Sequence, residues 1–292
     1  MALCCDGLVS YDDPERLRTV AEHLAAEAAA FVRRRRAELF GAGPANVQTT
    51  PVIRVKSSPT DPVSIVDTQT EQFLRDRLQQ LRPDDSILGE EGGGCHDVDS
   101  VRVRWVLDPI DGTVNFLYGI PAYAVSIAAQ RGGVSVAGAV ADVANAEIYS
   151  AAVGGGAHLL VDGERRPLWC SAVAELSQAL LGTGFGYDSS RRAAQAALLA
   201  QMLPLVRDVR RMGAAALDLC MVAAGRLDVY YEHGLNVWDW AAAALIAAEA
   251  GAFVALPEAT GADAGALLVA AAPGVAAQLM GALERYSGLE PR

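Results

Sequence analysis

The segment WVLDPIDGTVNF, residues 105–116, places two carboxylates and a glycine–threonine pair within six consecutive residues. The apolar stretch before it predicts a strand that ends at Asp108, because the proline that follows cannot donate to a strand ladder. A tight turn or a first helical turn would bring the carboxylate of Asp111 to the same side. Gly112 permits close approach of the backbone, and the N–H groups of Gly112 and Thr113 can face an oxyanion. With Mg²⁺ between the aspartates this arrangement attracts a phosphate; without it, the segment is an Asp-capped turn.

Three other segments place charged side chains where strands end, where a helix starts, or in a proline-containing loop. These side chains are Glu90 in ILGEEGGG, Glu232 and Asp239 in YYEHGLNVWDW, and Lys56, Asp61 and Asp67 in VKSSPTDPVSIVD. Each has an ordinary explanation as a turn residue, a helix cap or a solvated charge. Their occurrence together with DPIDGT favours a functional site.

The composition indicates a globular protein of one large domain or two intimate halves. The 292 residues are 52% hydrophobic and 20% charged, with a formal net charge of −11. This acidic balance argues against a general binder of nucleic acids or membranes, which needs a basic face. The five cysteines form no CxxC pair, the N-terminus lacks the features of a signal peptide, and the apolar run 241–256 is too short for a membrane span. We therefore expect a cytoplasmic protein.

Hydrophobic periodicity predicts strands and helices that mix throughout the chain, so the fold class is α/β or α+β. Helices are predicted at 14–39, 67–80, 191–202, 214–223 and 239–250, and strands at 86–88, 101–107, 123–130, 134–141, 148–152, 157–160, 179–182 and 228–231. Gly132 and Gly133 predict a hairpin turn. We expect a disordered tail over residues 1–13, an N-terminal α+β half over 14–170 and a C-terminal α/β half over 171–292. The run Arg33–Arg36 predicts a solvated helix face, with a partner or RNA contact as the less favoured alternative.

The charged segments together resemble the motif set of the inositol monophosphatase family. GEE is followed by WVLDPIDGT and then by WD before an alanine-rich helix, with KSSPTDPVS upstream, and the order and spacing match over about residues 14–290. The sequence is most similar to the actinobacterial SuhB-type members. The resemblance implies a layered α-β-α-β-α sandwich of the inositol monophosphatase/fructose-1,6-bisphosphatase type. It also implies a homodimer, with Mg²⁺ bound between the two halves of each chain.

The resemblance assigns metal ligands to individual residues. The first Mg²⁺ would be held by Glu90, Asp108 and the carbonyl of Ile110. The second would be held by Asp108, Asp111 and Asp239, and a third, weaker ion could bind Glu90 through water. The four carboxylates carry four negative charges that two Mg²⁺ cancel, so a third ion would make the site attractive to a phosphate dianion.

The resemblance also assigns the remaining roles. Gly112 and Thr113 would bind the phosphate through their backbone. The catalytic group that activates water would comprise Thr113 and Asp67 together with Glu90. The substrate would be contacted by Asp111, Ala215 and Glu232, with Lys56 and Asp61 in support.

The expected activity is Mg²⁺-dependent hydrolysis of inositol-1-phosphate to myo-inositol and phosphate, by direct attack of a metal-activated water. Relatives of this family also use fructose-1,6-bisphosphate, histidinol phosphate or 3′-phosphoadenosine 5′-phosphate, and some act as transcription-complex partners. A binding role would be an added one here, because no metal ligand is missing. Lithium sensitivity is expected from the resemblance alone. A haloacid-dehalogenase-type phosphatase is disfavoured, since its Asp-x-Asp-Gly-Thr signature has one residue fewer between the aspartates and usually lies near the N-terminus.

Two positions depart from the family pattern and leave the polyol preference open. Ala214 stands where many members have a serine or threonine, and Asn236 replaces a histidine of the animal members. The segment Gly92–His96 is more glycine-rich than usual and is interpreted as a mobile lid edge. Within it, Cys95 and His96 are interpreted as solvated loop residues rather than a metal pair.

Overall fold

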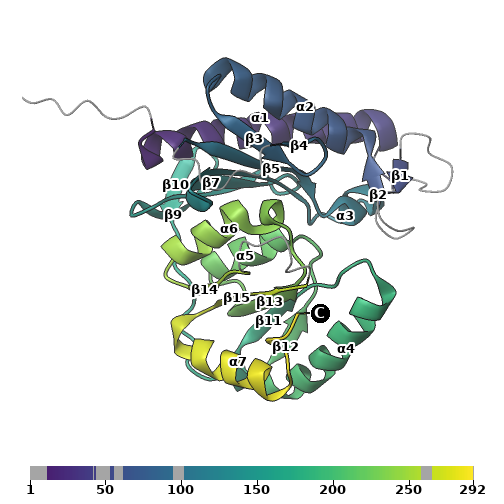
Figure 1. Ribbon diagram of the computed structural model, residues 1–292, viewed down its shortest axis with the longest axis vertical. Coiled ribbons are helices and arrows are strands. Elements are labelled where there is room, and N and C mark those ends of the chain that lie inside the picture. Colours follow the sequence, from purple (N-terminus) through teal and green to yellow (C-terminus); the bar gives the residue numbers. More distant parts are fainter. Residues whose placement is uncertain are drawn as a thin grey trace, which may run out of the picture.

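The computed structural model describes residues 12–41, 43, 53–55, 62–94, 102–257 and 265–291, which form alternating layers of helices and sheets (Figure 1). Helices α1 (Pro14–Phe40) and α2 (Ile65–Leu81) cover the outer face of a first sheet. Helices α5 (Ala215–Ala223) and α6 (Val237–Glu249) lie between this sheet and a second one, whose far side carries α4 (Ser189–Met202) and α7 (Pro273–Arg285). This order of layers confirms the predicted α-β-α-β-α sandwich.

The first sheet has eight strands in the order β10-β9-β8-β7-β6-β5-β3-β4. These strands are β3 (Ser86–Gly89), β4 (Gly93–Gly94), β5 (Arg104–Asp111), β6 (Ala124–Arg131), β7 (Val134–Asp142), β8 (Glu147–Ala152), β9 (Gly156–Val161) and β10 (Glu164–Pro167). Neighbouring strands are antiparallel except β3 and β5, which are parallel. The hairpin between β6 and β7 turns at Gly132 and Gly133, which have φ values of 55° and 76°, as predicted.

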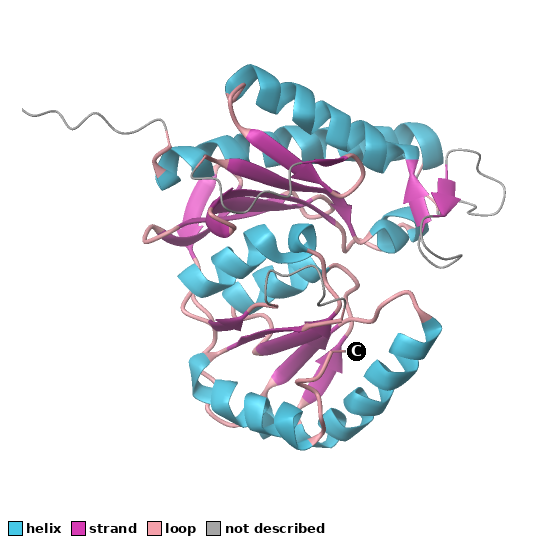
Figure 2. Cartoon of the chain, viewed as in Figure 1, coloured by secondary structure: helices cyan, strands magenta, loops and turns pink. Residues whose placement is uncertain are grey.

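The second sheet has five strands in the order β12-β11-β13-β15-β14 (lower magenta strands in Figure 2). These are β11 (Leu180–Thr183), β12 (Asp208–Arg210), β13 (Val229–His233), β14 (Phe253–Ala255) and β15 (Leu267–Ala271). Strand β11 is parallel to both of its neighbours, and the other pairs are antiparallel. All strands of the first sheet precede residue 168 and all strands of the second follow residue 179, a division compatible with the boundary proposed near residue 170.

Smaller elements connect these layers and the chain ends. Strands β1 (Ile53–Val55) and β2 (Pro62–Ser64) pair just before α2, the short helix α3 (Thr113–Tyr118) follows β5, and the 3₁₀ turns η1 (Leu176–Gln178) and η2 (Leu203–Leu205) precede β11 and β12. The proposed tail falls outside the described residues except for Asp12 and Asp13. Asp12 pairs with Arg82 at 2.5 Å, and Asp13 accepts a hydrogen bond from the first turn of α1.

Every helix and strand predicted from periodicity is present, with ends displaced by at most four residues. The prediction omits α3, α7 and the strands β1, β2, β4, β10, β12, β14 and β15. These strands are short, with two to five residues, so the signal that each carries in the sequence is weak. Among the described residues, no helix combines the length and the apolar character needed to cross a bilayer.

The arginine run at the end of α1 does more than form a solvated face. Arg34 is solvated as predicted, with 60% of its side chain exposed. The prediction is wrong for Arg36, whose guanidinium donates to the carbonyl oxygens of Phe116 and Gly41 at 3.0 and 3.1 Å. Arg36 therefore fastens the end of α1 to α3, and neighbouring Arg33 donates to the carbonyl of Val143.

Small residues allow α6 to lie directly on the first sheet. Four consecutive alanines, Ala241–Ala244, are buried, so the helix is enclosed on all sides between the two sheets. Opposite them on β7 stands Gly138, where an added Cβ would lie 3.0 Å from both the Cα and the Cβ of Ala242. The first sheet and the middle helical layer therefore approach closely at Gly138 and Ala242.

We expect Gly138→Val to lower the free energy of unfolding by about 1–3 kcal/mol, because overpacking displaces helix or strand. Urea unfolding followed by circular dichroism measures the change. Gly281→Ala is the matched control: a Cβ added to this α7 glycine would have nothing within 4 Å, so alanine should stabilise the helix by up to about 1 kcal/mol. Equal stability of Gly138→Val and wild type would contradict the close packing.

Candidate active site

Asp108 and Asp111 lie in one strand, separated by a bulge. In the pairing of β5 with β6, Asp108 is opposite Ser126 and Asp111 is opposite Ala124, with a register shift between them. The prediction that the strand ends at Asp108 is therefore wrong: the ladder absorbs the proline within the bulge and resumes at Asp111. Asp108 is 2% exposed, and its Oδ1 accepts a hydrogen bond from the N–H of Ile110 at 3.0 Å.

The carboxylate of Asp111 caps helix α5, which belongs to the other half of the chain. Its two oxygens accept hydrogen bonds from the N–H groups of Ala215 at 3.2 Å and Ala216 at 2.7 Å. The N-cap residue, Ala214, has no side-chain oxygen for this purpose. The structure thus places the backbone of Ala215 against Asp111. Where many family members have a serine or threonine, this chain has Ala214, and the start of α5 is capped by the carboxylate of Asp111.

Asp67 is held in one orientation by the start of α2 and reaches Thr113. Ser64 donates to Oδ2 of Asp67 from its hydroxyl at 2.5 Å and from its backbone N–H at 3.0 Å, which forms a capping box. This leaves Oδ1 for the hydroxyl of Thr113, which lies 3.1 Å away. The same hydroxyl is 3.1 Å from the carbonyl oxygen of Ile110. The predicted association of Asp67 with Thr113 is present as a direct hydrogen bond.

Gly112 shapes the turn between β5 and α3. Its φ of 87° belongs to the left-handed region, and a Cβ at this position would lie 2.9 Å from the carbonyl oxygen of Ala122 and 3.1 Å from the Cβ of Ala214. Glycine is therefore required both for the conformation and for the close approach of α3 to the start of α5.

Four carboxylates, of Glu90, Asp108, Asp111 and Asp239, lie close enough to influence one another electrostatically. Burial is the main cause that raises the pKa of Asp108 and of Asp239, and the charge of Glu90 is the next. The pKa of Asp111 is raised to about 7, mainly by burial and further by the charges of Glu232 and Glu90, against the opposing hydrogen bond from Ala216. Asp239 lies in the first turn of α6 and accepts the backbone N–H of Asn236 at 2.6 Å.

The four carboxylates form a loose group. Within the described part of the chain, no three histidine, cysteine, aspartate or glutamate side chains already converge as a cage around an ion. Like charges repel at short range, so a tighter grouping needs a cation or shared protons. Glu90 and Asp108 are the closest contact in the group, because a hydrogen bond between their side chains adds to the raised pKa of Asp108.

Glu232 lies within β13 rather than after it, and its direction is fixed. The hydroxyl of Tyr230, two residues earlier on the same face of the strand, donates to its Oε2 at 2.5 Å. A Cβ on Gly184 would lie 1.8 Å from the same oxygen, so the carboxylate occupies the space that this glycine leaves. Burial raises the pKa of Glu232, while Tyr230 and the charge of Arg211 oppose the rise.

Hydrogen bonds, close contacts or electrostatic interactions link the predicted site residues that the structure describes, whereas Lys56 and Asp61 lie outside the described residues. Cys95 and His96 also lie outside them, whereas Gly93 and Gly94 of the same segment form β4. Three residues that support the site are absent from the prediction: Ser64, Tyr230 and Asn115. The pattern Ser-x-x-Asp signals the first; Asn115 donates to the carbonyl of Met212, 97 residues away, which no local pattern reveals.

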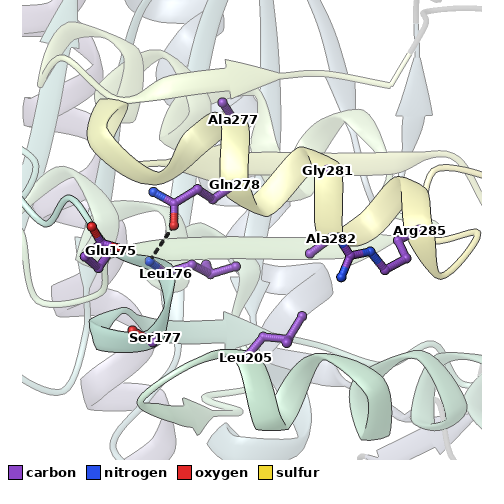
Figure 3. Close-up of a pocket in the computed structure, with 9 residues that line it drawn as sticks. All are labelled: Glu175, Leu176, Ser177, Leu205, Ala277, Gln278, Gly281, Ala282 and Arg285. Atoms are coloured by element: carbon purple, nitrogen blue, oxygen red, sulfur yellow. Dashed lines mark hydrogen bonds between the residues drawn. The ribbon is translucent and has the colours of Figure 1, made fainter.

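A surface groove of about 460 Å³ lies elsewhere, between η1, η2 and α7 (Figure 3). Its lining residues are Glu175, Leu176, Ser177, Leu205, Ala277, Gln278, Gly281, Ala282 and Arg285. The side chain of Gln278 accepts a hydrogen bond from the N–H of Leu176 at 3.0 Å and so ties α7 to η1. None of the predicted site residues that the structure describes lines this groove.

Comparison with known proteins places this arrangement in a family. Residues 13–287 match the inositol monophosphatase family. The chain belongs to the inositol monophosphatase family. It is 66% identical over 283 residues to the inositol-1-monophosphatase SuhB of Mycobacterium tuberculosis, covering 96% of this chain and 97% of that protein. The solved structure of Mycobacterium tuberculosis SuhB superposes with a TM-score of 0.81 at 62% identity, covering 96% of this chain and 100% of the other.

A more distant relative carries a different name. The Nus factor SuhB of Xylella fastidiosa is 40% identical over 203 residues, covering 68% of this chain and 70% of that protein. The matches confirm the resemblance found in the motifs, including its SuhB-type character. Members of the inositol monophosphatase family are phosphatases, and the chain is an enzyme of this class.

We expect the metal-free protein to lose stability as the pH rises from about 4 to 8. Asp67 and Asp111 have pKa values raised from 3.8 to about 7, so between these values the folded state binds more protons than the unfolded state. The contribution of these two groups to the free energy of unfolding is therefore fully present below about pH 4, and it is lost as they ionise in the folded state. Thermal unfolding at pH 5, 6, 7 and 8 with chelator measures this.

Asp111→Asn supplies the control, because an uncharged side chain at this position should reduce the decline in the thermal midpoint. Adding Mg²⁺ should raise the midpoint more at pH 8 than at pH 5, where protons compete for the carboxylates. A midpoint that rises steadily with pH without metal would contradict the raised pKa values.

Proposed function

We propose that the chain hydrolyses inositol-1-phosphate to myo-inositol and phosphate in a Mg²⁺-dependent reaction. The observation that carries the proposal is the group of four interacting carboxylates beside the hydrogen-bonded pair Thr113 and Asp67. The high identity to a protein named inositol-1-monophosphatase supports the choice of substrate. The homodimer implied by the motifs and the cytoplasmic location stay predictions.

The residues fit Mg²⁺ chemically. The proposed donors are all oxygens, from Glu90, Asp108, Asp111, Asp239 and the carbonyl of Ile110, the ligand type that Mg²⁺ prefers. The raised pKa values of Asp108, Asp111 and Asp239 arise from burial and from neighbouring negative charges, including that of Glu90, and a divalent cation relieves both. When bound, Mg²⁺ supplies positive charge for the phosphoryl oxygens and the leaving group, and it acidifies water.

Thr113 and Asp67 are proposed to orient the attacking water and take its proton. A hydroxyl has one hydrogen, so Thr113 can donate fully either to Asp67 or to Ile110, both 3.1 Å away. If the Ile110 carbonyl served as a metal ligand, that hydrogen would be directed to Asp67, and the lone pairs of Thr113 would be left to accept from water. As water attacks phosphorus, its proton passes to Thr113 while the hydroxyl proton passes to Asp67. A pKa of about 7 suits Asp67 to this role near neutrality.

The substrate is proposed to lie between the turn after β5 and strand β13. The backbone N–H groups of Gly112 and Thr113 would contact the phosphate. Glu232 would accept hydrogen bonds from ring hydroxyls, with its orientation fixed by Tyr230. Fructose-1,6-bisphosphate, histidinol phosphate and 3′-phosphoadenosine 5′-phosphate are the competing substrates, and kcat/KM compared across this panel decides among them.

An added binding role is the second candidate, favoured by the similarity to a protein named as a Nus factor. Such a role requires the fold and its surface rather than the carboxylates. It therefore predicts that loss of a carboxylate abolishes hydrolysis without abolishing association with a transcription complex.

Asp108→Asn should lower kcat by about 100-fold or more. Loss of a residue that only orients a metal ligand typically costs about 10–100-fold, and loss of a ligand proposed to hold two ions should cost more. Steady-state hydrolysis of inositol-1-phosphate measures this across a Mg²⁺ titration. Asp142→Asn is the matched control: Asp142 is a buried aspartate bonded to Asn145, outside the carboxylate group. Full activity of Asp108→Asn, or activity of the wild type in excess chelator, would reject the proposal.

Glu232→Gln should reduce transition-state stabilisation for inositol-1-phosphate by about 1–3 kcal/mol, the range of a hydrogen bond to a charged group. The amide retains the shape but accepts more weakly. The comparison is kcat/KM on inositol-1-phosphate against p-nitrophenyl phosphate, which has no ring hydroxyls and should lose less. If both substrates lose equally, Glu232 acts in the chemical step and not in recognition of the ring.

A further inference from the structure

Glu71 is a buried carboxylate on α2 that takes no part in the proposed reaction. It lies one helical turn after Asp67, on the same face, and is 2% exposed. Its two oxygens accept hydrogen bonds from consecutive backbone N–H groups, of Glu91 at 2.7 Å and of Gly92 at 2.8 Å. The carboxylate therefore holds the chain immediately after Glu90.

Arg75, one further turn along α2, completes the grip. Its Nε lies 2.8 Å from Oε1 of Glu71, and its Nη2 donates to the carbonyl oxygen of Gly93 at 2.5 Å. Two successive turns of the helix thus bind donors and an acceptor of one short backbone segment, 91–93. Hydrogen bonds that involve charged groups are the stronger ones, so this attachment is firm.

The sequence around Glu90 is fitted to this attachment. A Cβ on Gly89 would lie 2.4 Å from the Glu71 carboxylate, and one on Gly92 would lie 2.7 Å from its Oε1. Glycine on both sides of the two glutamates therefore admits the Glu71 side chain. The two glycines of the segment Gly-Glu-Glu-Gly are therefore explained by the packing of Glu71 against it, and Glu90 by its proposed role as a metal ligand.

Glu90 is consequently fixed from two directions. Its N–H donates to the carbonyl oxygen of Leu107 at 3.1 Å, which ties it to β5 beside Asp108. The chain that leaves it is tied to α2 through Glu71. With the backbone held on both sides, the Cα–Cβ bond of Glu90 has a fixed direction, and its carboxylate interacts with that of Asp108.

We propose that Glu71 is a positioning residue for Glu90 and, through it, sets the affinity of the site for divalent cations. The inference rests on the proposed function, since it takes Glu90 as a metal ligand. It makes α2 a single support for two parts of the reaction: Asp67 at its first turn orients Thr113, and Glu71 at the next turn orients Glu90. In metal sites generally, residues that orient the ligands raise the affinity for the metal.

The test is binding of Mn²⁺ alone, which shares the oxygen-ligand preference of Mg²⁺ and is followed by the electron paramagnetic resonance of the free ion. Glu71→Gln replaces one carboxylate oxygen by an amide N–H₂, which cannot accept the hydrogen bond from the backbone N–H of Glu91 or Gly92. The segment 91–93 therefore loses one of its attachments to α2. We expect the dissociation constant of Mn²⁺ to rise by about 10–100-fold. KM for inositol-1-phosphate at saturating Mg²⁺ should change little.

Arg75→Gln separates positioning from simple electrostatics. Removal of a positive charge near the site would strengthen cation binding if charge alone mattered. Loss of the contact with Gly93 and of the support for Glu71 should instead weaken it. Weaker Mn²⁺ binding in this variant therefore supports the positioning role, and tighter binding overturns it. Arg75 is one quarter exposed, so this variant carries the test if Glu71→Gln does not fold.

Glu27→Gln is the matched control, a glutamate of α1 that also pairs with an arginine of α2. Glu27 accepts two hydrogen bonds from Arg77, at 2.9 and 3.2 Å, and takes no part in the attachment of the segment 91–93. Its Mn²⁺ affinity should equal that of wild type. An unchanged affinity in both folded test variants, or an equal loss in Glu27→Gln, overturns the inference. If wild type itself does not bind Mn²⁺, the proposed metal site fails and not the positioning role alone.

Discussion

Mutual repulsion among carboxylates is the constraint on which the arrangement of this molecule depends. Asp108 is buried and Asp111 and Asp239 are partly buried. Burial raises the pKa of all three carboxyl groups, and the negative charge of Glu90 raises each of them further. The fold supplies backbone N–H groups that reduce the cost. Asp111 accepts from the start of α5, and Asp67 and Asp239 sit in the first turns of α2 and α6, where the helix macrodipole favours negative charge.

The layered sandwich explains how helix starts from both halves reach one place. Helices α5 and α6 lie between two sheets, and they can do so closely because alanines and Gly138 line the contact. Helix α2 approaches from the opposite face of the first sheet and reaches the same site through its first turns. Arg36 of α1 fastens α3, which begins at Thr113, so even the outer helices contribute to the position of the catalytic turn.

Much of this could be predicted from local patterns. Period and capping signals located the long helices, and the carboxylates were recognisable because motif segments keep their order along the chain. The contacts that orient those carboxylates could not be predicted in the same way. Glu71 bonds to backbone N–H groups 20 and 21 residues away, and such donors exist in every sequence. Ala215 was expected from the resemblance to contact substrate, but its bond to Asp111 is made by the main chain, which its residue type does not signal. The bulge in β5 was hidden because a proline ordinarily ends a strand.

That bulge decides which way two side chains point. In a regular strand, residues separated by three positions project from opposite faces, so Asp108 and Asp111 would have been divided by the sheet. One extra residue opposite Val125 changes the parity and returns both to one side. It also takes Ile110 out of the regular ladder, so its carbonyl meets the hydroxyl of Thr113 instead of a neighbouring strand. Deleting a single residue here would leave the composition of the motif almost intact and yet alter its geometry, so the number of residues between the aspartates is itself part of the functional information in this sequence.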